Sequence, residues 1–153
     1  MPRTDFPTIP FSDFALRWRF TLHEHHVLSE TDLRQIQPLE RASARQLLML
    51  VSGRCPIAPV RGERPVISSL SVGGPEDVLR VQTWLRQLGI SPDERVLLSW
   101  NASDAATTTW RIFVTYWNVF WYPSSDDLTV VDTDFTWSLF LSHEEEASFA
   151  PHP

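Results

Sequence analysis

The chain of 153 residues contains no lysine, and all 13 of its basic residues are arginine, which codon bias in a GC-rich genome explains most simply. A single cysteine, Cys55, can form no internal disulfide and so excludes a disulfide-stapled fold. No apolar run approaches the ~18–20 residues that span a membrane. Residues 1–5 lack the apolar stretch of a signal peptide. These absences predict a cytoplasmic protein without a membrane segment.

The charge is unevenly distributed along the chain. Residues 1–90 carry 11 Arg and 9 Asp or Glu, a net charge of +2, whereas residues 91–153 carry 2 Arg and 10 Asp or Glu, a net charge of −8. An acidic surface repels the phosphates of nucleic acid, so a nucleic-acid partner is not expected. Complementary charge speeds encounter with a basic protein, which is the class of partner that this half favours.

The first half predicts an irregular arm and a mixture of elements. Residues 1–13 are rich in proline and phenylalanine and are expected to form the arm, followed by one domain over residues 14–150. Alternation of apolar and polar residues predicts a half-buried strand over about 15–23. A near-match to a capping box at 29–32 predicts a helix start there. A further helix is expected over 39–51.

The second half is the more strongly patterned. Strands are expected at 65–72 and 95–100, with a helix between them that begins near 73–77 and ends at Gly89. Helical spacing of the large apolar side chains predicts one helix over about 105–121. A β-meander then follows; its expected strands are 128–132, 136–142 and 147–149. The sum is an α+β fold, with one mostly antiparallel sheet of about five or six strands covered on one face by about three helices.

Catalytic motifs are weak by comparison. His23 and His25 would share one face of the expected strand and, with His143, are candidate zinc ligands, although a polar strand end leading into a turn explains them more simply. The run 143–146 could be an acid/base set or a solvated turn. The acidic pairs at 126–127 and 132–134 lack the glycine and distal glutamate of a calcium loop. Neither a nucleophile elbow nor a phosphate-binding loop occurs, so no catalytic residue and no cofactor are expected.

Acids and exposed aromatics are the candidates for a binding surface. Trp121 and Tyr122 lie at the exposed end of the expected helix and precede the acidic run 124–127, an arrangement typical of an aromatic anchor in a protein interface. The expected partner-binding residues are Trp121, Tyr122, Asp126, Asp127, Asp132, Asp134, Glu144, Glu145 and Glu146. The remaining tryptophans, at helical or alternating spacing, are expected to lie mainly in the core.

About a third of the chain carries a family resemblance. Its residues are Val96 to Asn101, Trp110, Phe113, Trp117, Phe120, Tyr122 to Asp127, Trp137 and His143 to Glu145. They resemble small uncharacterised bacterial proteins of the kind found among immunity proteins of polymorphic toxin and contact-dependent inhibition systems. The resemblance implies a non-enzymatic protein that binds and blocks a cognate toxin. A metal-dependent enzyme using His23 and His25, and a structural or assembly subunit, are the alternatives.

Overall fold

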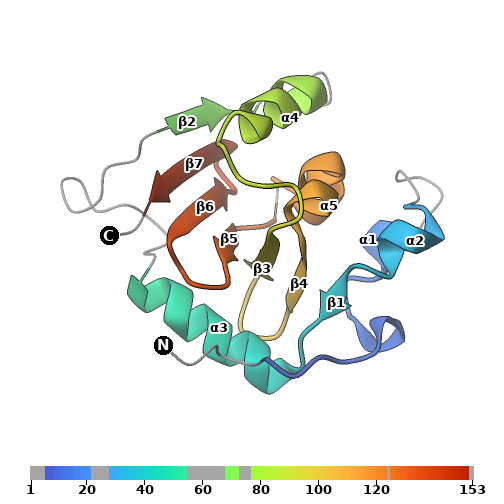
Figure 1. Ribbon diagram of the computed structural model, residues 1–153. Helices are drawn as coiled ribbons and strands as arrows, with labels where there is room; N and C mark the ends of the chain where they lie inside the picture. Colours follow the sequence, from blue (N-terminus) through green and yellow to red (C-terminus); the bar gives the residue numbers. More distant parts are fainter. Residues whose placement is uncertain (1–5, 22–27, 55–67, 73–76, 124, 152–153) are drawn as a thin grey trace.

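A computed structural model describes residues 6–21, 28–54, 68–72, 77–123 and 125–151. In these residues seven strands form one sheet in the order β1-β4-β3-β5-β6-β7-β2, and every neighbouring pair is antiparallel (Figure 1). The expected α+β class is confirmed, with more strands and helices than expected. The strands are β1 (Gln37–Pro38), β2 (Ser68–Ser71), β3 (Arg95–Ser99), β4 (Ala105–Thr109), β5 (Leu128–Asp132), β6 (Trp137–Ser142) and β7 (Glu146–Pro151).

Helical segments precede, interrupt and cover the sheet. The described ones are η1 (Phe11–Asp13), α1 (Trp18–Thr21), α2 (Glu30–Leu33), α3 (Arg41–Arg54), α4 (Val78–Arg86), α5 (Trp110–Thr115) and α6 (Trp117–Phe120). None of these helices has both the length and the apolar character that crossing a membrane requires. The expected helices at 39–51 and before Gly89 are confirmed as α3 and α4, and Gly89 follows α4 with a φ of +80° that favours glycine.

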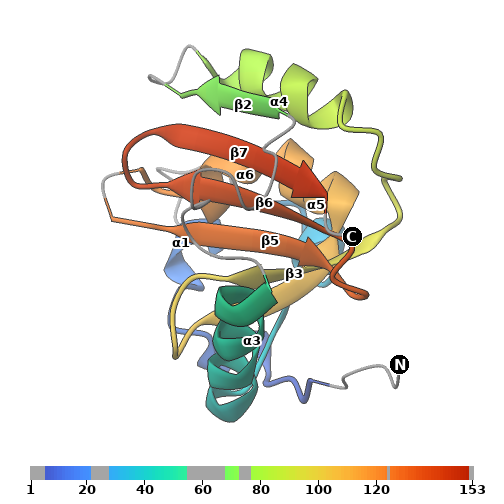
Figure 2. The same ribbon diagram turned by 90° about the vertical axis from the view of Figure 1, so that its left-hand side faces the viewer.

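Both faces of the sheet are covered, so the expectation of helices on one face only is wrong. Along β3, Val96 and Leu98 point into one apolar cluster, whereas Leu97 points into a second cluster with Leu47 and Val51 of α3. Figure 2 shows α3 on the near side of the sheet and α5 and α6 on the far side. The cause lies in β3 and β5, which carry apolar side chains on both faces and therefore need cover on both sides.

The larger cluster lies between the sheet and α1, α4, α5 and α6, and it is rich in aromatic rings. Phe20 of α1 packs edge-on against Phe120 with ring centres 4.9 Å apart, and Trp100 stacks on the same phenylalanine at 6.3 Å. The Trp100 indole N–H donates to the Phe120 carbonyl oxygen at 2.7 Å, so its buried polar group has a partner. This cluster fixes the C-terminal end of α6 and therefore the start of the loop after it.

Two element assignments from the sequence are wrong. The strand expected over 15–23 contains the helix α1, in which the adjacent residues Arg19 and Phe20 are both buried. The helix expected over 105–121 begins only at Trp110, because Ala105–Thr109 pairs with β3 as β4. Thr109 then caps α5 by accepting a hydrogen bond from the Ile112 N–H. The helical periodicity of the prediction came from the residues after 109. The threonines at 107–109 are β-branched and follow their preference for strands.

The remaining expectations fit the described residues closely. The Ser29 hydroxyl accepts from the Asp32 N–H at the start of α2, which confirms the cap. The meander is confirmed as β5, β6 and β7, and the strand at 95–100 as β3. The arm is attached to the sheet from Phe6 onward: Phe6 is buried, and Thr8 forms a bridge with Leu39 next to β1.

Because α3 covers the second face of the sheet, substitutions in α3 test this packing through the stability of the protein. Leu47 is fully buried, whereas Met49, two residues on, is 68% exposed. Leu47→Ala should therefore lower the unfolding free energy by about 2–5 kcal/mol through lost burial and a cavity, and Met49→Ala should change it by less than about 0.5 kcal/mol. Urea denaturation followed by circular dichroism measures both. Equal, small effects would contradict the packing of α3 on the sheet.

Candidate functional site

One end of the sheet collects most of the expected acidic residues. Asp127 precedes β5, and its carboxylate accepts from the His143 backbone N–H at 2.8 Å and lies 2.8 Å from Nδ1 of the His143 ring. This contact joins the loop before β5 to the turn between β6 and β7. The turn between β3 and β4 reaches the same end, since Ser99 pairs with Thr129. We call this end, with Asp104, Asp127, Glu144, Glu145 and Glu146, the acidic end.

Asp132 and Asp134 do not belong to the acidic end. Asp132 ends β5 and Asp134 lies in the turn that follows, at the far end of the strand that Asp127 precedes. Asp132 is 5% exposed and accepts from the Thr136 N–H at 2.6 Å, the Thr136 hydroxyl at 2.5 Å and the Trp137 N–H at 3.3 Å. The Asp132 carboxylate therefore closes the turn, which corrects its assignment as a partner-binding residue. Asp134 is exposed, but it lies at the other end of the sheet from the acidic end.

Asp126 is also internal, because it forms a buried ion pair with Arg19. The two Asp126 carboxylate oxygens lie 2.5 Å and 3.1 Å from Nη1 and Nη2 of Arg19, and both side chains are about nine-tenths buried. The Tyr122 N–H donates to the same carboxylate at 2.9 Å. The Arg19 guanidinium lies 4.2 Å from the centre of the Tyr122 ring, a cation–π contact. The pair therefore ties α1 to the loop over 122–127, and the expected role of Asp126 as a surface acid is corrected.

Of the two expected aromatic anchors, Trp121 is buried and Tyr122 is partly exposed. Trp121 is 1% exposed, and its indole N–H donates to the Asp126 carbonyl oxygen at 3.1 Å, so it is a core residue. Tyr122 is half-buried and meets Trp18 edge-on with ring centres 5.8 Å apart. Trp18 is 41% exposed and was placed on a strand by the sequence, which gave no signal that it would lie beside Tyr122. Tyr122 and Trp18 thus form an aromatic pair beside the loop that leads to Asp127.

The metal and acid/base hypotheses obtain no support from the described residues. His23 and His25 lie outside them, so their expected role as ligands is not described. His143 is the partner of Asp127, and in the described part of the chain no three His, Cys, Asp or Glu residues are grouped as metal ligands would be. The weak candidate His143 is thereby given a different role, that of a contact between two loops.

Opposite charges shift both pKa values in the His143–Asp127 contact. The hydrogen bond with Asp127, reinforced by its charge, raises the pKa of His143 above the ordinary 6.5. Burial alone would raise the pKa of Asp127, but the hydrogen bonds from the His143 backbone N–H and ring, with the charge of the ring, hold it below 3.8. The ion pair is therefore formed across the whole interval between these two ordinary values.

Comparisons of the chain with protein-family models, with curated proteins and with solved structures found no match. The residues expected from the sequence that lie at or beside the acidic end are Asp127, Tyr122 and the three glutamates. Sequence reasoning missed Asp104, Trp18 and Arg19. The place of Asp104 in a turn between two strands would have indicated that it lies at a strand end. Arg19 and its partner Asp126 are 107 residues apart, and no local pattern links them.

Removing one partner of the buried pair should be costly. Asp126→Ala leaves the Arg19 charge buried without a counterion, and we expect a loss of about 3–5 kcal/mol in unfolding free energy. Asp134→Ala is the control, since it removes an exposed carboxylate at the other end of the sheet and should cost less than about 0.5 kcal/mol. Chemical denaturation measures both variants. A loss below about 1 kcal/mol for Asp126→Ala, the value of a solvent-exposed ion pair, would contradict the buried geometry.

The His143 contact predicts a pH dependence with a definite sign. Because its pKa is raised in the folded protein, the contribution of His143 is complete below 6.5 and is lost as the pH rises through the folded value. The contribution of Asp127, whose pKa is lowered, is complete above 3.8 and is lost as the pH falls through its folded value. NMR titration should give His143 a pKa above 6.5 that decreases in Asp127→Asn. An unchanged pKa in that variant would refute the contact.

Proposed function

We propose that this protein is a non-enzymatic binding protein whose acidic end contacts a basic protein partner, as an immunity-type inhibitor contacts a toxin. The observation that carries the proposal is the grouping of carboxylates from three separate turns at one end of the sheet, joined by the His143–Asp127 contact. Tyr122 and Trp18 border this end and supply the aromatic contacts that interfaces favour.

Three of these carboxylates are free to act on a partner. Glu144, Glu145 and Glu146 are exposed, and within the described residues no arginine or histidine lies at ion-pairing distance from any of them. Adjacent unpaired charges add to a local negative potential that raises the rate of encounter with a basic surface. Their repulsion carries a cost in the free protein that a basic partner would relieve.

Glu145 gives independent support through its backbone. Its φ is +64°, in the left-handed region that glycine enters without cost and that other residues enter at a cost of order 1–3 kcal/mol. The turn is held by the bond from the Glu145 N–H to the Ser142 carbonyl oxygen at 2.9 Å and by the bond from the Val72 N–H to the Glu145 carbonyl oxygen at 2.8 Å. A glutamate where glycine would fit better favours a role for its side chain in binding.

The proposal is tested with the product of the adjacent gene as the probe. Co-expression of the two should restore growth that the probe alone inhibits, and the purified proteins should associate at a rate that falls with added salt. A neighbouring product that neither inhibits growth nor binds would refute the inhibitor role.

Matched charge variants then locate the interface. Glu144→Gln, Glu145→Gln and Glu146→Gln together should lower the association rate at low salt by at least about ten-fold and flatten its salt dependence. The control combines Asp93→Asn, Glu94→Gln and Asp134→Asn, which removes three charges at the opposite end and should leave the rate nearly unchanged. Equal effects of the two triple variants, measured by stopped-flow fluorescence, would contradict binding through the acidic end.

A further inference from the structure

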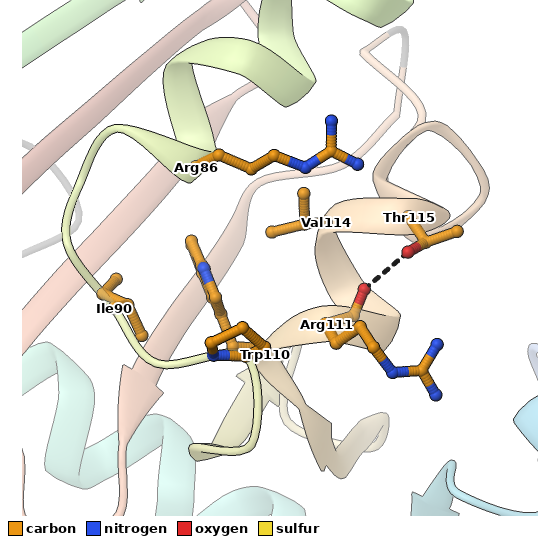
Figure 3. A pocket seen from close by; sticks show the side chains of 7 residues that line it. Arg86, Ile90, Trp110, Arg111, Val114 and Thr115 are labelled. Atoms are coloured by element: carbon orange, nitrogen blue, oxygen red, sulfur yellow. Dashed lines mark hydrogen bonds between the residues drawn. The ribbon is translucent and has the colours of Figure 1, made fainter.

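A small pocket lies at the opposite end of the sheet from the acidic end. It opens between the C-terminal residue of α4, the connection that leads to β3, and the first turns of α5 (Figure 3). Its volume is about 260 Å³, and it is lined by Arg86, Ile90, Pro92, Trp110, Arg111, Val114 and Thr115. Drug-sized ligands occupy ~300–1,000 Å³, so this pocket suits a smaller ligand built on a single ring.

The pocket wall is apolar and rigid. Trp110 and Val114 are 2% and 3% exposed, so their positions are fixed by the core behind them. Figure 3 shows the Trp110 indole between Ile90 and Val114. Trp110 is held in turn by its contacts with Phe113 and Trp137, whose ring centres are each 5.5 Å away. The wall is thus preformed and does not need to be ordered by a ligand.

The pocket rim is positively charged, although the net charge of the chain is −6. Arg86 is exposed, and among the described residues no carboxylate lies within ion-pairing distance of it. Arg111 also lines the pocket, but its Nη2 donates to Asp32 at 3.2 Å, and Asp32 also accepts from the Tyr116 hydroxyl at 2.6 Å. Asp93 and Glu94, next to Pro92 in the chain, are not lining residues. Arg86 is therefore the cation available to a ligand.

We propose that this pocket binds a small carboxylate with a flat or branched apolar body, such as an aromatic monocarboxylate. Arg86 holds the carboxylate through charge-assisted hydrogen bonds, and the ring packs against Ile90 and Pro92, the more exposed apolar residues of the lining, above the buried Trp110 and Val114. The aliphatic stem of Arg111 forms the opposite rim, while its guanidinium stays with Asp32. Because the pocket and the acidic end lie at opposite ends of the sheet, this site does not depend on the proposed partner binding.

The test uses the full chain with benzoate and with benzyl alcohol, its neutral counterpart of similar shape. Two-dimensional NMR should show benzoate shifting the Trp110 indole and Val114 methyl signals, with saturation at millimolar concentration. Benzyl alcohol should bind at least about ten-fold more weakly, because it lacks the charge that Arg86 recognises. Equal affinities for the two probes, or no shift at these signals up to about 10 mM benzoate, would overturn the proposal.

Two variants separate the role of Arg86 from a general effect of charge. Arg86→Gln should raise the dissociation constant for benzoate by at least about ten-fold. Arg80→Gln removes the same charge from the same helix outside the pocket, where Arg80 pairs with Asp77, and should leave the constant within about two-fold. Thermal unfolding verifies that both variants are folded. Equal losses in the two variants, or none in Arg86→Gln, would show that Arg86 does not hold the carboxylate.

Discussion

The buried ion pair between Arg19 and Asp126 holds the N-terminal helical segment against the loop that leads into the acidic end. Removing two charges from water is costly, and the pair offsets that cost with two guanidinium–carboxylate contacts, the Tyr122 N–H and a cation–π contact. The compensation is incomplete, because Nε of Arg19 is buried without a hydrogen-bond partner in the described structure. The pair therefore fixes how α1 meets the loop, since either charge alone would be buried without a counterion.

The sheet sets where every other functional group lies. Because β3 and β5 are apolar on both faces, α3 covers one side and α5 and α6 the other, which leaves the ends of the strands as the exposed parts of the central sheet. Antiparallel order brings the turns after β3 and β6 and the loop before β5 to the same end. The turn after β5 is carried to the other end, where Asp132 closes it and Asp134 points to solvent. The acids of the second half thus lie at both ends of the sheet, and at one of these ends Asp132 is used to close a turn.

The parts that sequence could predict are those with a local cause. Strand β5 and helix α4 follow from hydrophobic pattern and helix-start residues within a few positions of each other, and both are confirmed. Helix α1 was missed because two neighbouring residues, Arg19 and Phe20, are both buried, one in an ion pair and one among aromatic rings. Asp126 and Asp132 looked like surface acids, since the sequence does not show that Arg19 and Thr136 bind them. Whether such an acid is exposed or buried depends on long-range pairing and turn geometry.

A double-mutant cycle on the ion pair tests the central claim most directly. The unfolding free energies of the wild type, Arg19→Met, Asp126→Asn and the double variant give the coupling between the two side chains without the separate cost of each substitution. The account predicts a coupling of at least about 1.5 kcal/mol, because the two groups share one buried contact. A coupling within about 0.5 kcal/mol of zero, the range of independent sites, would contradict it.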